Sequence, residues 1–361
     1  MNIRQFGQLC KAIAGGQDAT ALWHGAGSEG AAMVQMARDQ RVLPLLAVAI
    51  GQNRRQGGVV PTVQTPLQHV TKNLRIKGQL LEIDRCLQGS DCGAILIKGA
   101  VRLFDGVYPN IGMRHLADID ILVPDQQFGL ALVKMGYRPA DANCQDTYDA
   151  TGRPVLPHGA HHLTPVIRPD DPVTIEPHLL ATAARYRKLL PTDLTSTAVV
   201  VPGCKNLRQL SGKNDLIVNL IHTLLHDRDT LDGGLLLRGL VECELMFARL
   251  AAEDQAAVAR HFADCGAAKL WTAWRALSEW LFGGDDKALW RSVSGYLLIS
   301  EFRLRARGYR MVFVISVLHR IKALAQVRYW TSGTVVGHAR RYGQLGFWAR
   351  ISDRFRRAYK G

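Results

Sequence analysis

Apolar residues follow two different spacings along the chain, and the change between them divides the sequence into three parts. In residues 1–90 they recur every three or four positions, as at Ile76 and Leu80, which predicts helices. Residues 91–204 carry short apolar runs and alternating patterns, which predict strands. Residues 205–361 begin with long helical patterns rich in Leu, Ala and Trp. We therefore expect an α+β protein in which helical segments precede and follow a small core of strands.

Two aspartates stand two positions apart in one of the apolar runs. Side chains alternate across a strand, so Asp118 and Asp120 point to one face while Ile119 and Ile121 point to the other. Two neighbouring carboxylates repel each other unless a positive charge neutralises them. Oxygen ligands of this kind suit Mg²⁺ or Mn²⁺, which substrate phosphates usually complete. The pair therefore predicts a metal site that works on a phosphorylated substrate.

A second apolar run ends in Lys98 and Gly99, where a strand would open into a turn. A glycine lets backbone N–H groups approach a phosphate, and a lysine adds a positive charge. Arg114 precedes the aspartates by four and six positions. It could bind a phosphate or hold the aspartates in place, and the sequence leaves both roles open.

A hairpin is predicted further along, with strands over His161–Ile167 and Val173–Leu179. Glu176 and His178 share one face of the second strand. Pro177 between them lacks the N–H that a central strand needs, which favours an edge strand or a strand end.

The layout of strand, Lys-Gly turn, helix and paired aspartates resembles nucleotidyltransferases of the polymerase-β type. The run from Leu96 to Tyr137 more closely resembles a bacterial nucleotidyltransferase family long described as uncharacterised. The matching motifs are Lys98-Gly99, Tyr108-Pro109, Arg114, Asp118-Ile119-Asp120 and Gly136-Tyr137, with weaker similarity in residues 37–46 and 215–247.

This resemblance implies a small mixed-sheet nucleotidyltransferase core at 91–204, between an N-terminal helical segment (1–90) and a C-terminal helical domain (205–361). It implies transfer of an NMP from an NTP, with ATP first among the donors, to a hydroxyl or phosphate acceptor on a small molecule or peptide. Pyrophosphate would leave. The implied metal ligands and catalytic carboxylates are Asp118, Asp120 and Glu176, with Mg²⁺ or Mn²⁺ as the cofactor. Glu176 could instead belong to a polar outward face of its strand, so its place as the third carboxylate stays open. The implied nucleotide-binding residues are Lys98, Gly99 and Arg114.

Several polar residues in the later segments have two readings each. His178 could orient the acceptor or the base, or serve only as a hydrogen-bonded structural histidine. Arg238 could reach the active-site cleft and help orient the acceptor, although an ion pair with Glu242 on the helix surface is the simpler account. His222 and His226 lie one helical turn apart and could in principle share a metal. However, no His-Glu-x-x-His motif is present, and we expect both on a core-facing helix.

Nearly all of the net charge of +14 lies at the C-terminal end. Residues 302–361 hold fourteen Lys or Arg and one acid, Asp353. Such a tail favours RNA, acidic lipid headgroups or an anionic substrate, or forms a solvated helix. Two alternatives therefore accompany the transferase prediction. One is a toxin-like enzyme that modifies tRNA; the other is an inactive nucleotide- or partner-binding protein docked peripherally to a membrane or assembly.

The remaining composition points to the cytoplasm. The seven cysteines are scattered and form no Cys-x-x-Cys pair, which fits a reducing compartment. The first residues do not resemble a signal peptide, and no apolar run is long enough to predict a transmembrane segment.

Overall fold

The computed structural model describes residues 3–17, 30–48, 66–88, 93–123, 127–140, 147–148, 154–155, 161–227, 235–283, 298–300 and 302. The chain divides into two units, Met1–Arg307 and Gly308–Gly361, and every described residue belongs to the first. The basic tail at 302–361, with the RNA and membrane roles predicted for it, therefore lies outside the described residues apart from Phe302. No helix among the described residues is both long enough and apolar enough to cross a membrane.

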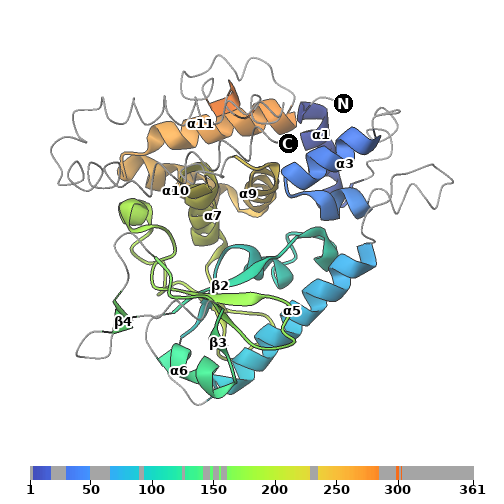
Figure 1. The fold of residues 1–361 in the computed structure, drawn as a ribbon. Coiled ribbons are helices and arrows are strands. Elements are labelled where there is room, and N and C mark those ends of the chain that lie inside the picture. Colours follow the sequence, from blue (N-terminus) through green and yellow to red (C-terminus); the bar gives the residue numbers. More distant parts are fainter. Residues whose placement is uncertain are drawn as a thin grey trace, which may run out of the picture. The chain divides into compact units, whose positions relative to one another are not determined.

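A seven-stranded mixed sheet forms the centre of the first unit, in the order β3-β6-β7-β2-β1-β9-β8 (Figure 1). Its strands are β1 (Ile95–Leu96), β2 (Asp118–Leu122), β3 (Arg138–Pro139), β6 (Val166–Ile167), β7 (Thr174–His178), β8 (Val199–Val200) and β9 (Arg208–Gln209). Strand β2 runs antiparallel to β1 and parallel to β7, and β1 runs parallel to β9. A separate pair joins β4 (Thr147–Tyr148) to β5 (Pro154–Val155).

Helices make up most of the remaining described structure. The α-helices are α1 (Ile3–Ala14), α3 (Gly30–Asp39), α5 (Pro66–Cys86), α6 (Gln127–Lys134), α7 (Gly212–Ile221), α9 (Leu237–Arg249), α10 (Ala252–Asp264) and α11 (Ala268–Ser278). Short 3-10 helices are η1 (Lys98–Leu103), η2 (Ile111–Met113) and η3 (Ala184–Leu189), and π-helical turns are η4 (His222–His226) and η5 (Glu279–Gly283). The predicted α+β fold with a mixed-sheet core is confirmed.

Two apolar cores hold these elements together. In one, Ile119 and Ile121 of β2 pack with Ile76 and Leu80 of α5, and all four side chains are fully buried. Each such side chain contributes about 1.5–3 kcal/mol by leaving water. The second core joins α1, α3, α7, α9, α10 and α11 into a helical layer (Figure 1). Because α5 covers the isoleucine face of β2, the aspartate face is left for the active site.

The predicted hairpin is confirmed, since Val166 of β6 pairs antiparallel with Ile175 of β7. The prediction of an edge strand from Pro177 is wrong, because β7 lies between β6 and β2. The strand-end alternative holds: Pro177 is the last residue but one of β7. The core boundary at residue 204 stays a prediction; β9 lies just beyond it and joins the same sheet.

Candidate active site

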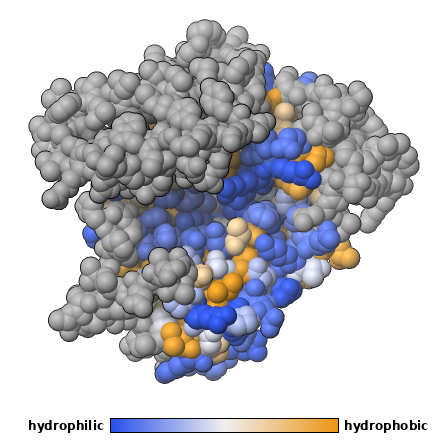
Figure 2. Space-filling view, viewed as in Figure 1, coloured by the Kyte–Doolittle hydropathy of each residue, from blue (hydrophilic) through white to orange (hydrophobic). Residues whose placement is uncertain are grey.

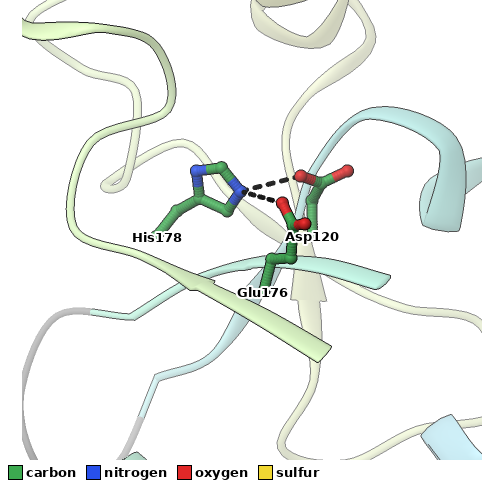
Figure 3. A group of neighbouring side chains, drawn as sticks. All are labelled: Asp120, Glu176 and His178. Atoms are coloured by element: carbon green, nitrogen blue, oxygen red, sulfur yellow. Dashed lines mark hydrogen bonds and ion pairs between the residues drawn. The ribbon is translucent and has the colours of Figure 1, made fainter. Parts of the chain in front are cut away.

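Three carboxylates from two neighbouring strands meet on one face of the sheet. Asp118 and Asp120 share a face of β2, and the parallel register places Glu176 of β7 directly beside Asp120. All three line one cavity. Ligand atoms of Asp120, Glu176 and His178 lie within 4.8 Å of one another (Figure 3). Sheet pairing thus assembles the predicted acidic group from residues far apart in the sequence.

Asp120 is held by two positively polarised partners. Nζ of Lys98 and Nε2 of His178 each lie 2.7 Å from its Oδ1 (Figure 3 shows the histidine). Burial alone would raise the pKa of Asp120, but the charge of Lys98 and the hydrogen bond from His178 outweigh it and hold that pKa far below its usual range. Asp120 therefore stays an ionised carboxylate with one fixed orientation.

Asp118 is in the opposite situation. Burial raises its pKa, and the charges of Asp120 and Glu176 raise it further, against the opposing effect of Lys98 and Arg114. The pKa of Glu176 is lowered, chiefly by its interaction with the imidazole of His178. Asp118 thus favours its neutral form, whereas the surroundings of Asp120 and Glu176 favour the ionised form.

His178 lies behind the carboxylates, not in front of them. Its side chain has no exposed surface, and it is not among the residues that line the cavity. Besides its bond to Asp120, its Nε2 lies 3.7 Å from Oε2 of Glu176. It is placed to position both carboxylates and does not reach a molecule in the cavity.

Lys98 and Gly99 form the turn at the end of β1. Lys98 adopts a φ of 55°, a left-handed conformation that non-glycine residues seldom adopt and that is frequent at functional sites. A Cβ on Gly99 would lie 2.7 Å from Cδ2 of Leu116 and 2.8 Å from Nη2 of Arg114. Only glycine leaves room for the guanidinium of Arg114 beside the turn.

Arg114 is anchored by a buried ion pair. Its Nε donates to Oε2 of Glu242 at 2.6 Å, and Arg102 lies 3.5 Å from the other oxygen of Glu242. Glu242 is only 2% exposed, so the predicted ion pair with Arg238 on the helix surface is wrong. Arg102 also pairs with Asp105 at 2.6 Å and with Asp215. This network fixes Arg114 at the edge of the cavity.

Two further arginines line the cavity near Arg114. Burial lowers the pKa of Arg238 to about 10, and the charges of Arg114 and Arg41 act in the same direction. Arg41 follows α3 and, like Lys98, has a φ of 55°. Arg41 could not be predicted from the sequence, because it belongs to no local motif and only the fold brings it to the cavity.

The cavity therefore lies between the sheet and the helical layer. Figure 2 shows hydrophilic residues gathered across the described surface at this level. The lining side chains come from β2, β7, the turn after β1, η4 and α9.

The profile of the family described as uncharacterised nucleotidyltransferase matches residues 28–283, which include all of these elements. The chain belongs to this family. No curated protein sequence matches it significantly.

For a nucleotidyltransferase, the carboxylate group fits a divalent metal. Asp118, Asp120 and Glu176 supply oxygen donors, the type of ligand that Mg²⁺ and Mn²⁺ prefer. Burial and the neighbouring charges of Asp120 and Glu176 raise the pKa of Asp118. A bound cation would offset the repulsion among these carboxylates.

Four histidines complete the cavity of this nucleotidyltransferase. His222 and His226 project from the π-helical turn η4, and His161 and His162 come from the segment before β6. The expectation that His222 and His226 face an apolar core is wrong. Their spacing alone did not reveal this, because the same spacing suits either a core or a cavity.

Proposed function

We propose that the protein is a metal-dependent transferase that moves an NMP from an NTP to a hydroxyl or phosphate acceptor on a small molecule or peptide. ATP is the proposed donor, and pyrophosphate leaves. The observation that carries this proposal is the meeting of Asp118, Asp120 and Glu176 opposite the Lys98-Gly99 turn, in a cavity also lined by three arginines.

The metal would be held by Asp118, Asp120 and Glu176. When bound, Mg²⁺ or Mn²⁺ would draw negative charge from the α-phosphate and from the leaving pyrophosphate. His178 keeps two of these carboxylates oriented from behind through its bond to Asp120 and its proximity to Glu176. The protein's part is thus to prepare the ligand set before a substrate arrives.

Lys98, Gly99 and Arg114 would bind the triphosphate. Gly99 lines the cavity at the turn, and Arg114 lies against it, close enough to exclude a Cβ. A guanidinium suits phosphate oxygens because its N–H groups form a planar fork. The same groups would stabilise the charge that develops on pyrophosphate.

Transfer requires one bond to form and one to break. An oxygen of the acceptor attacks the α-phosphorus, and the bond from that phosphorus to the bridging oxygen of pyrophosphate breaks. For a hydroxyl acceptor, Glu176 takes the proton, since its carboxylate lines the cavity beside Asp120. Its lowered pKa favours the ionised form that accepts a proton.

The test is label transfer from α-labelled NTPs with Mg²⁺, offered total RNA in one reaction and a metabolite and peptide extract in another. Loss of a metal-binding carboxylate removes several kcal/mol of transition-state stabilisation, so we expect Asp120→Asn to lower the rate by roughly 10²–10⁴-fold. Asp264→Asn, at an exposed position that ends α10, is the matched control and keeps full activity. Full turnover by the Asp120 variant would refute the proposal. Label on RNA would instead support the tRNA alternative.

A further inference from the structure

The four histidines that line the cavity form one continuous group, the imidazole wall. Ring centroids are 4.9 Å apart between His161 and His162, between His161 and His226, and between His222 and His226. None of the four has a role in the proposed phosphate chemistry. They lie in the same cavity as Glu176, the group proposed to take the acceptor's proton.

In two of these imidazoles, Nδ1 is already engaged in a hydrogen bond or ion pair, which leaves Nε2 as a hydrogen-bond acceptor. Nδ1 of His162 lies 2.8 Å from the backbone oxygen of Leu163, so Nδ1 carries the hydrogen. Nδ1 of His222 lies 3.4 Å from Oδ1 of Asp227, a carboxylate whose pKa that bond helps to lower although burial opposes it. In a neutral imidazole with a protonated Nδ1, Nε2 has a lone pair and no hydrogen. His162 and His222 therefore offer Nε2 as an acceptor.

The other two members of the wall are uncharged near neutral pH. Burial lowers the pKa of His161 to about 3 and that of His226 to about 4, and nearby Lys98 acts in the same direction. Nδ1 of His226 is buried and has no hydrogen-bond partner among the described residues. His161 and His226 thus add ring lone pairs to the wall and carry no positive charge there.

Another part of the cavity is lined by three arginines, whose positive charge contrasts with the imidazole wall. The guanidinium of Arg238 is influenced by those of Arg114 and Arg41, and Arg114 adjoins the Lys98-Gly99 turn. These groups donate hydrogen bonds and suit phosphate oxygens. The triphosphate is therefore matched to the arginines, which leaves the wall for the second substrate.

We propose that the imidazole wall binds the acceptor, and that this acceptor is a non-anionic sugar or amino sugar with several hydroxyl or amino groups. This rests on the proposed function. Hydroxyl and ammonium groups donate to imidazole lone pairs, whereas an ionised phosphate has only acceptor oxygens and would face other acceptors. One hydroxyl of the sugar attacks the α-phosphorus, its proton goes to Glu176, and pyrophosphate leaves.

A transition-metal site is the competing use of clustered histidines. Metal-bound imidazoles also donate their second N–H to a carboxylate or carbonyl, as His222 and His162 do here. However, among the described residues the only group of ligand atoms within 4.8 Å of one another is that of Asp120, Glu176 and His178. The spacing of the wall favours hydrogen bonding to a larger molecule.

The experiment uses the full-length protein with α-labelled ATP and Mg²⁺. The acceptors are total RNA, the two halves of a bacterial metabolite extract split on an anion exchanger, and the defined pair glucosamine and glucosamine 6-phosphate. Asparagine keeps a donor where Nδ1 lies but has nothing at the position of Nε2, whereas glutamine places a polar atom there. We therefore compare His162→Asn/His222→Asn with His162→Gln/His222→Gln, and use His261→Gln, outside the cavity, as the control.

We expect label in the unretained half of the extract, and glucosamine to be preferred to its phosphate if either is used. The double asparagine variant should raise the apparent KM for that half about 10–100-fold, since two hydrogen bonds are lost, with the KM for ATP unchanged. The double glutamine variant should retain more of the acceptor affinity, and His261→Gln all of it.

Several results would overturn this inference. Label only in the retained half, or in no pool while ATP is still cleaved to AMP and pyrophosphate, would reject the acceptor class and leave the proposed function intact. Label only in RNA would reject the acceptor class and favour the tRNA alternative over the proposed function. An unchanged acceptor KM in the double asparagine variant would reject the binding site. Stoichiometric Zn²⁺ binding that this variant loses would assign the wall to a metal. Absence of both label and ATP turnover would reject the proposed function itself.

Discussion

Asp118 should limit the stability of the protein while it supports activity. Burial and the charges of Asp120 and Glu176 raise its pKa, so the folded state resists ionisation of this carboxyl. The change Asp118→Asn keeps the shape of the side chain and removes the charge. We expect the variant to lose transferase activity and yet unfold at a higher temperature than the wild type when no divalent metal is present.

The expected gain in stability follows from what proteins typically gain when an unfavourable charge is removed. Stabilising substitutions of this kind yield about 1 kcal/mol, which raises the melting temperature of a protein of this size by about 1–2 °C. Because the pKa of folded Asp118 is raised, the destabilisation is complete above that pKa and absent below the ordinary carboxyl value near 4. The advantage of the asparagine variant should therefore shrink as the pH falls through that window.

Thermal unfolding with and without Mg²⁺ provides the assay. At about 100 times its dissociation constant, a bound ion stabilises the wild type by about 2.7 kcal/mol, or roughly 3–5 °C. Asp118→Asn should lose most of this increase because it lacks one ligand. The reasoning is refuted if the variant melts below the metal-free wild type, or if Mg²⁺ stabilises both proteins equally.

Three other substitutions test the surroundings of the site. Glu242→Gln leaves the buried charges of Arg102 and Arg114 without their shared partner and should cost about 3–5 kcal/mol in unfolding free energy, measured by chemical denaturation; a loss under 1 kcal/mol would contradict this. Gly99→Ala should displace Arg114 and raise the KM for NTP in steady-state kinetics, with an overpacking cost of about 1–3 kcal/mol; an unchanged KM would count against the triphosphate assignment. Asp84→Ala removes the acceptor of the backbone N–H groups of residues 205–207 and should lower the free energy of unfolding by about 1.5–3 kcal/mol, measured by thermal unfolding, without changing the KM for NTP. A variant as stable as the wild type would disprove this.

The paired aspartates and their strand were predictable because strand geometry alone decides their common face. The partner of that strand was harder to predict. The pairing of Asp120 with Glu176 depends on a parallel register between β2 and β7, and the hairpin pattern around Glu176 says nothing about which strand lies on its other side. The two-residue strand β9 was missed because a segment that short has no period to detect.

Long-range contacts also explain the errors at the cavity. Glu242 was expected at a helix surface, since an i,i+4 pair is satisfied within one helix; its actual partners, Arg102 and Arg114, come from segments more than a hundred residues earlier. Arg41 has no local pattern of any kind. His222 and His226 have the right spacing for a buried helix face, and only packing of η4 above the sheet turns that face into a cavity wall.

The distribution of site residues along the chain has a consequence for biosynthesis. The Lys98 turn and the aspartates of β2 leave the ribosome first, Glu176 and His178 follow, and the helices bearing His222 and Glu242 come later. Domains fold as their segments emerge, and no residue of α9 can pack before it has been made. The carboxylates are therefore synthesised well before the helices that cover them, and a nascent chain stopped ahead of α9 contains the proposed metal ligands without the anchor that holds Arg114.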